Sequence, residues 1–338
     1  MVMTNRHRVM PMRSDSAPPA RDARSCGIMG RVTGVVEGFA TIIAVITLGW
    51  GLARVGLFDL AAQQMLSKLA FYVASPALMV TVLSDADVST VLSANLIATV
   101  SSVLVVVTLY VLLARFVFRQ DLADTVVGAL SASYVNAGNL GLPIAAYVLG
   151  DAALVAPALL LQMLLLQPLV LTVLDSAVAE QRLSWLQVMS RPFRNPLTLG
   201  SIVGVLLSVT STPLPRVVHD PLELVGGMAV PGMLIAYGIS LRLGPRPGTG
   251  DRPRLLWTIV TLKMVVQPLV AYAVARFALG LEGPELLAVT VIAALPTAQN
   301  IFVIASRYGR ATILARDAIF ASTLLSVPAV ALITALLT

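Results

Sequence analysis

Two short stretches of the sequence place side-chain amides beside glycine and proline within otherwise apolar runs. The first extends from Asn136 to Pro143, and the second from Pro296 to Asn300. Amides donate and accept hydrogen bonds without a charge, so they can bind a carboxylate inside a membrane at modest desolvation cost. Glycine and proline weaken a helix at the same place, because proline has no N–H donor and glycine adds backbone freedom. The pattern predicts two interrupted helices around one anion site.

The two stretches supply the nine residues that we predict to form the substrate site. Backbone that leaves a helix inside a membrane is tolerated only where protein or a wet cavity satisfies it. If the two breaks cross, half-helices that begin there aim N–H groups and the positive ends of their dipoles at one spot. The alternative is a pair of proline kinks whose amides bond neighbouring helices. The nine residues are Asn136, Gly138, Asn139, Gly141, Pro143, Pro296, Thr297, Gln299 and Asn300.

The elements that position these residues are helices in a membrane. The chain has 338 residues, of which 57% are hydrophobic and 12% are charged, with a mean hydropathy of +0.88. Soluble proteins average about 25% charged residues, so an all-α polytopic membrane protein is predicted. A bilayer core requires roughly 20 apolar residues per helix. We predict about ten spans, with eight or nine as alternatives: Gly34–Leu57, Leu66–Leu83, Val88–Phe118, Thr125–Leu149, Ala152–Ala177, Pro196–Val209, Leu222–Leu241, Leu255–Leu279, Glu285–Tyr308 and Ala311–Leu337.

An internal repeat relates the two halves of the chain. Leu69–Leu78 resembles Leu224–Met233, with a proline at matching positions, and chance matching among apolar residues is the alternative. A repeat of five helices is odd, so the second copy would enter from the opposite face, as in many secondary transporters. The predicted division is a disordered basic tail at 1–30, five-helix repeats at 31–178 and 196–338, and a short cytoplasmic linker at 179–195. A translation start at Met29 is an alternative reading of the tail.

Basic residues predict the topology and exclude several function classes. Arginines concentrate in alternate loops, which places these loops in the cytoplasm and both termini outside a plasma membrane. One cysteine and two histidines give no metal site and suggest no cofactor. The apolar segments hold no histidine and no paired carboxylates, so an enzyme is not predicted. The basic excess fits membrane topology rather than nucleic acid. Lys263, inside the eighth segment, is expected to extend its amine to the interface.

The two broken-helix motifs resemble the auxin efflux carrier family, which includes plant PIN-FORMED carriers and bacterial organic-acid carriers of the malate and malonate type. Asn136 to Pro143 is similar to the family's fourth helix, Pro296 to Gly309 to its ninth, and Gly226 to Ser240 to its seventh. The resemblance spans about Gly34 to Leu337. It implies ten helices, a fixed scaffold of helices one, two, six and seven, and a moving domain formed by the rest. It also implies an elevator motion, a crossover site for a small organic anion and a homodimer.

One departure from the family makes auxin a doubtful substrate. Plant members often carry a long cytoplasmic loop between the halves, and here only about 178–195 lies there. The residues leave uniport, exchange and coupling to sodium open. A non-transporting receptor or assembly protein built on a carrier fold is the alternative function.

Overall fold

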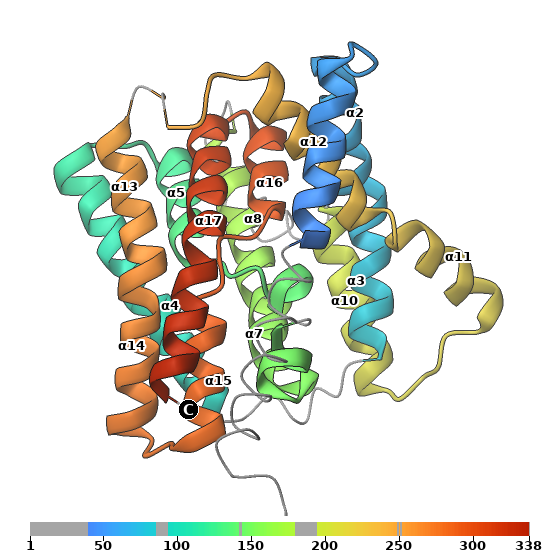
Figure 1. Cartoon of the computed structure of the whole chain (residues 1–338). Coiled ribbons are helices and arrows are strands. Elements are labelled where there is room, and N and C mark those ends of the chain that lie inside the picture. The colour runs from blue at the N-terminus through green and yellow to red at the C-terminus, as the bar shows by residue number, and fades with distance from the viewer. Residues whose placement is uncertain are drawn as a thin grey trace, which may run out of the picture.

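The computed structural model describes residues 40–85, 94–141, 144–179, 195–248, 250 and 252–337. The predicted tail at 1–30, Pro143 and most of the predicted linker lie outside these residues. The described part of the chain is helical and contains no strand (Figure 1). The prediction of an all-α membrane protein is confirmed at this level.

Six continuous helical runs in the described residues are long and apolar enough to cross a membrane. They consist of α2 (Leu60–Leu69) with η1 (Ala70–Ala74) and α3 (Ser75–Ser84); α4 (Ala94–Leu113) with η3 (Ala114–Phe118); α7 (Ala156–Leu160) with η7 (Leu161–Leu166) and α8 (Gln167–Ala177); α11 (Arg216–Gly226) followed by α12 (Ala229–Leu243); α13 (Pro253–Thr261) with η9 (Leu262–Val266), α14 (Gln267–Ala273) and η10 (Val274–Ala278); and α17 (Thr312–Leu337).

The remaining helices are shorter, and two of them end at the predicted breaks. The shorter apolar helices are Ala40–Arg54, α5 (Leu122–Ser133), α10 (Pro196–Val209) and α15 (Gly283–Ala293). After the breaks come η4 (Ala137–Gly141) and α16 (Asn300–Tyr308), and the connection to α7 adds η5 (Ala145–Leu149) and η6 (Ala152–Val155). Among the described residues, length and composition mark six runs as candidate spans, so the ten-span inverted repeat stays a prediction.

Local sequence accounts for where several helices begin, end and loosen. Asp59 accepts a hydrogen bond from the Ala62 N–H and caps α2, which therefore begins at Leu60 rather than at the predicted Leu66. Gly309 has a φ of 63° and ends α16 in the left-handed conformation that glycine adopts without strain. The π-helical turns η7 and η9 end directly before Gln-Pro pairs. Proline has no N–H to donate and crowds the preceding turn. The helical hydrogen bonds therefore change there to the wider spacing of a π-helix.

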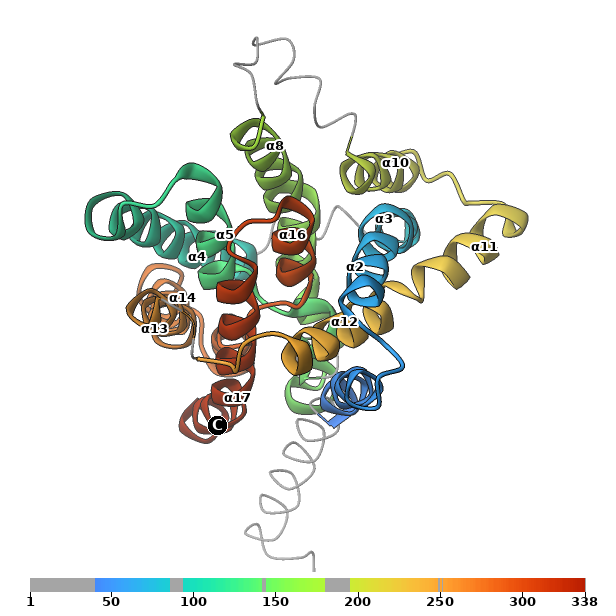
Figure 2. The ribbon, with the colours of Figure 1, turned by 90° about the horizontal axis from the view of Figure 1, so that it is seen from above.

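Viewed from above, the helices form two groups (Figure 2). We call α2, η1, α3, α10, α11, α12 and the helix Ala40–Arg54 the glycine-packed group. We call α4, α5, α7, η7, α8, α13, α14, α15, α16 and α17 the broken-helix group. Within the first group α10 packs against α3, and α12 packs against α2. Within the second group α4 packs against α5 and α14, and α17 packs against α13 and α16.

Glycine allows backbones in the glycine-packed group to touch. A Cβ atom added at Gly49 would lie 2.3 Å from the carbonyl oxygen of Ile235, and one at Gly238 would lie 2.1 Å from that of Ile46. A Cβ atom at Gly200 would lie 2.6 Å from the carbonyl oxygen of Pro76. Membrane helices have no hydrophobic driving force between them, so such close approach supplies the van der Waals energy of association. These contacts join Ala40–Arg54 to α12 and α10 to α3.

Gly238→Ala is expected to destabilise the protein by about 1–3 kcal/mol, because the new methyl group would force two backbones apart. Gly232 lies in the same helix and has no atom within 4 Å of an added Cβ. Gly232→Ala is therefore the matched control, and it should leave the melting temperature of the detergent-solubilised protein unchanged. Equal melting temperatures for both variants would contradict the backbone contact.

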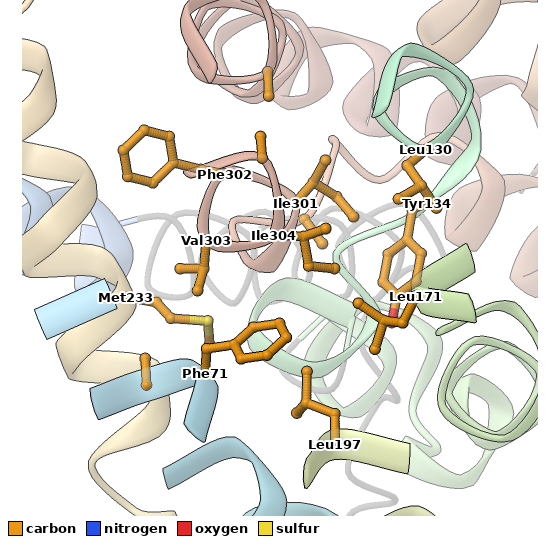
Figure 3. Close-up of a cluster of buried hydrophobic side chains, with 14 of the residues drawn as sticks. Phe71, Leu130, Tyr134, Leu171, Leu197, Met233, Ile301, Phe302, Val303 and Ile304 are labelled. Atoms are coloured by element: carbon orange, nitrogen blue, oxygen red, sulfur yellow. The ribbon is translucent and has the colours of Figure 1, made fainter. Parts of the chain in front are cut away.

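An apolar cluster lies at the boundary between the two groups (Figure 3). Phe71 and Met233 come from the glycine-packed group, whereas Tyr134 and Phe302 come from the broken-helix group. The rings of Phe302 and Tyr237 of α12 meet edge to face, with centroids 5.6 Å apart. The groups therefore meet there through apolar side chains.

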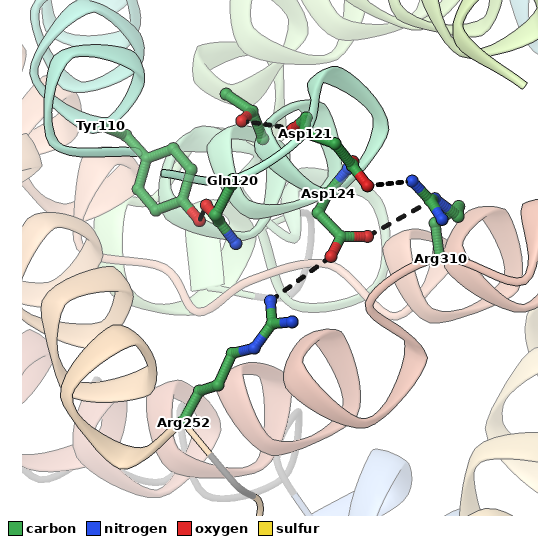
Figure 4. Close-up of polar contacts among 7 residues, drawn as sticks. Tyr110, Gln120, Asp121, Asp124, Arg252 and Arg310 are labelled. Carbon is green, nitrogen blue, oxygen red and sulfur yellow. Dashed lines mark hydrogen bonds and ion pairs between the residues drawn. The ribbon is translucent and has the colours of Figure 1, made fainter. Parts of the chain in front are cut away.

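Charged residues from three connections meet at one end of the broken-helix group (Figure 4). Asp124 pairs with Arg252 and Arg310, and Arg310 also bonds Asp121. Partial burial opposes ionisation of Asp121, but hydrogen bonds from the Asp124 N–H and from Arg310 outweigh it and lower the pKa of this carboxyl. The contacts place the connections α4–α5, α12–α13 and α16–α17 on the same face, as the arginine pattern requires.

Candidate functional site

The two breaks lie against each other and bond through their backbones. Val135 and Thr297 form an isolated antiparallel bridge. The Asn136 N–H donates to the Pro296 carbonyl oxygen at 2.8 Å, and the Ala298 N–H donates to that of Tyr134 at 3.2 Å. Proline at 296 cannot donate, but its carbonyl is used in the pairing. Each break thus satisfies backbone groups of the other where the helical ladder is lost.

Thr297 fastens the second break to two neighbouring helices. Its hydroxyl donates to the Ser131 carbonyl oxygen of α5 at 2.6 Å, and its N–H donates to the Ser322 hydroxyl of α17 at 3.1 Å. Thr297 and Ser322 have no exposed surface. Thr297 and Pro296 therefore shape the break, and neither lines the cavity described next.

Three amides form a small network at the crossing. Gln299 Oε1 accepts hydrogen bonds from Asn136 Nδ2 at 2.9 Å and from Asn139 Nδ2 at 3.4 Å. Asn136 Oδ1 accepts from the Asn139 N–H at 3.3 Å. Asn136 and Gln299 are almost fully buried. The network ties both breaks together and fixes which atoms of Gln299 face which partner.

A cavity of about 100 Å³ adjoins this network. One water molecule needs roughly 10–15 Å³ of such space, so the cavity has room for several waters or a small ligand. Five predicted site residues line it: Asn136, Gly138, Asn139, Gln299 and Asn300. Gly141 does not line it. A Cβ atom at Gly141 would lie 2.7 Å from the side chain of Val155, so this glycine permits close packing instead.

The cavity walls differ in polarity. The amides come from the broken-helix group and its breaks, whereas the facing wall comes from the glycine-packed group. That wall is apolar except for Ser75, and it consists of Phe71, Leu78, Met79, Leu197, Val230 and Met233. No charged side chain is among the lining residues in the described part of the chain. A ligand carboxylate in this cavity would be held by amides and backbone rather than by a cation.

Further polar residues of the site escaped the sequence analysis. Gln162 and Gln167 of the fifth apolar segment line the cavity, and Gln167 Oε1 accepts from the Tyr134 hydroxyl at 3.2 Å. A sequence signal existed, because Gln-Pro occurs in the fifth segment at Gln167 and again in the eighth at Gln267. An amide beside a proline places a polar side chain where the helix lacks a backbone hydrogen bond, and the two breaks show the same combination.

The expectation that Lys263 reaches the interface is wrong. Lys263 is fully buried, and its Nζ donates to Gln267 Oε1 at 2.8 Å and to the Ala293 carbonyl oxygen at 3.0 Å. Gln267 Nε2 in turn donates to the Ser133 carbonyl oxygen at 2.9 Å. Ala293 and Ser133 are the last residues of α15 and α5. Lys263 and Gln267 thus donate to carbonyl groups that have no helical donor because α15 and α5 end there.

The half-helix N-termini are less free than the sequence suggested. The first break leads into the π turn η4 rather than a regular α-helix, and Asn136 O accepts from Leu140 and Gly141. In α16 the N–H groups of Ile301 and Phe302 bond to Ala298 and Gln299 carbonyls. The tight turns consume donors that an ideal N-terminus would offer. Side-chain amides therefore carry most of the site's polar character.

Three buried polar atoms of the cavity residues have no hydrogen-bond partner within the described part of the protein: Gln162 Oε1, Gln299 Nε2 and Asn300 Oδ1. Buried polar atoms are nearly always paired, and each unpaired one costs about 1–3 kcal/mol. Their concentration at one cavity is the feature expected of a site that a polar ligand completes.

Comparison with known proteins identifies related chains. A family model described as "Membrane transport protein" matches residues 34–334. A protein of Rhizobium meliloti (strain 1021) described as "Putative malonate transporter" is 27% identical over 308 residues, covering 89% of this chain and 94% of the relative. The match extends over both halves of the chain and both breaks.

Proposed function

Because this chain belongs to the membrane transport protein family, the family of the auxin efflux carriers that its motifs resemble, we propose that it carries a small organic anion across the membrane as a secondary transporter. The observation behind the proposal is the cavity at the crossing of the two breaks. It combines side-chain amides, buried unpaired polar atoms and no charged lining residue in the described chain. A membrane receptor has no use for the two breaks and would only have kept them from a carrier ancestor. Transport therefore accounts for the breaks better.

The proposed substrate class is a small carboxylate, with malonate as the first candidate. The relative from Rhizobium meliloti is described as a "Putative malonate transporter". The cavity supports the proposal by size and chemistry, since about 100 Å³ suits an anion of a few heavy atoms and amides can donate to carboxylate oxygens.

We place the moving boundary of the transporter between the two helix groups. The cavity's polar wall belongs to the broken-helix group and its apolar wall to the glycine-packed group. An apolar wall forms few directional bonds, so it can slide past a bound ligand at lower cost than a hydrogen-bonded one. In this elevator model the glycine-packed group stays fixed. A plasma-membrane homodimer with both termini outside completes the proposal.

The proposal is tested by uptake of labelled malonate into liposomes that hold the purified protein. Gln63 of α2 and Ser306 of α16 lie on opposite groups, with Gln63 Nε2 and Ser306 Oγ 3.5 Å apart. In a Cys26→Ser background, Gln63→Cys and Ser306→Cys joined by a bifunctional thiol reagent should lower uptake about tenfold, to the limit set by cross-linking yield. Reduction of a cleavable linker should restore it.

Each single cysteine variant treated with the same reagent is the matched control and should transport normally. Full uptake with the cross-link formed would exclude motion between the groups. Binding of malonate without uptake by the unmodified protein would favour the receptor function.

A further inference from the structure

The hydrogen-bonding orientation of two cavity glutamines is fixed by their other contacts. Gln299 Oε1 accepts from Asn136 and Asn139, so Gln299 Nε2 is a donor without a partner. Gln162 Nε2 donates to the Ala158 carbonyl oxygen at 3.1 Å, so Gln162 Oε1 is an acceptor without a partner. These side chains are 1% and 3% exposed. Asn300 Oδ1 is a second acceptor without a partner, so the residues that line the cavity carry one unpaired buried donor and two unpaired buried acceptors among the described residues.

A fully ionised carboxylate can pair with the donor but with neither acceptor. Its oxygens accept from Gln299 Nε2, but it has no hydrogen to give to Gln162 Oε1. Charge imposes a second restriction, because the described lining residues include no cation. The Born cost of burial grows with the square of the charge, so a dianion is disfavoured far more than a monoanion. A ligand that fits has one negative charge and at least one O–H group.

We infer that the cavity takes a small carboxylate as a singly charged species whose O–H group donates to Gln162 Oε1 while its carboxylate accepts from Gln299 Nε2. This inference rests on the proposed function and narrows its substrate. Two sources share this chemistry: the half-protonated form of a dicarboxylic acid and a 2-hydroxy monocarboxylate. A dicarboxylic acid bound in this form brings its own proton through the membrane.

Protein groups near the cavity that could also titrate are few among the described residues. Tyr134 lines the cavity, and Lys263 lies behind Gln267. Asp175 of α8 accepts from the Tyr308 hydroxyl of α16 at 2.8 Å. Arg316 and Asp317 of α17 pair with each other near Tyr237. Asp175 is the carboxyl on an element that lines the cavity, so Asp175→Asn is the variant that separates substrate protonation from protein protonation.

The test measures binding of three acids to the purified full-length protein. Affinity for total malonate should rise about tenfold per pH unit of acidification, until the half-protonated form predominates. The same dependence should persist in Asp175→Asn. At constant pH, lactate should bind about twofold to tenfold more tightly than propionate, which differs from it only by the hydroxyl group. The malonate measurement tests the half-protonated dicarboxylic acid, and the comparison of lactate with propionate tests the 2-hydroxy monocarboxylate.

Gln162→Met should remove these preferences, lowering affinity for acidified malonate or for lactate about twofold to tenfold and leaving propionate unchanged. Gln64→Met, at an exposed glutamine of α2, is the control. Malonate affinity that is independent of pH, together with equal binding of lactate and propionate, would overturn the inference while leaving carboxylate binding intact. Failure of all three acids to bind would overturn the proposed function and the inference with it.

Discussion

Gln299→Met is expected to lower the affinity of the protein for malonate by about a hundredfold. The variant loses Gln299 Nε2, a buried donor of a residue that lines the cavity, which has no partner among the described residues. A hydrogen bond to a charged group contributes roughly 1.5–3 kcal/mol. The variant also loses Gln299 Oε1, which holds the amides of Asn136 and Asn139 in place. Adding about 1 kcal/mol for the misplaced amides gives a total near 3 kcal/mol, which corresponds to about a hundredfold in affinity.

Equilibrium binding to the purified protein measures this effect, and the melting temperature in detergent reports folding. Methionine preserves the length of the side chain, so the fold should survive. Asn139→Ala and Asn300→Ala each remove one lining amide and should cost about tenfold. Asn95→Ala, in α4 and away from the lining residues, should cost nothing. Unchanged malonate affinity in a folded Gln299→Met protein would show that the crossing is not the substrate site.

Lys263→Met is expected to lower the stability of the protein by about 2–4 kcal/mol and to abolish most transport. The change leaves the Ala293 carbonyl and Gln267 Oε1 without their donor. Each orphaned buried acceptor costs about 1–3 kcal/mol. Gln267 would then lose its fixed orientation toward Ser133, so the ends of both α5 and α15 would loosen. Because both ends lead directly into the breaks, the cavity should lose its shape as well.

Lys68→Met is the matched control, since Lys68 is the other lysine of the chain and lies exposed in α2. It should change stability by less than about 0.5 kcal/mol. Melting temperature and malonate uptake in liposomes are the two measurements. A Lys263→Met protein that melts and transports as the unmodified protein does would show that the buried amine does not support the breaks.

The sequence was informative where several unusual residues coincide. Amides, glycines and prolines together predicted the breaks after Ser133 and Ala293, and the amides of both breaks do meet at one cavity. Single amides such as Gln162 and Gln167 were missed. In the sequence, one glutamine in an apolar helix looks the same whether it lines a site or lies at a kink on the surface of the bundle. Gly141 was placed in the site for its type, although its role is set by the neighbouring Val155. Only the packing of helices reveals such roles.

The long-range partners were beyond sequence reasoning for a similar reason. The burial of Lys263 depends on the approach of α15, whose Ala293 lies 30 positions away. A lysine near a helix end usually extends to the interface, and periodicity alone cannot distinguish that case from burial at a helix end. The order of helices in the bundle decides it.

The described lining of the cavity includes no cation, so a membrane potential would act on the charge of the transported anion itself. An anion that crosses a potential of 100 mV gains or loses about 2.3 kcal/mol per charge. In a cell with a negative interior, this voltage drives a monoanion outward. A pH gradient acts on the half-protonated acid in the opposite sense, because each unit of external acidity is worth about 1.4 kcal/mol through the abundance of that form. About 1.7 pH units therefore offset 100 mV, and the direction of net flow would follow whichever gradient is larger.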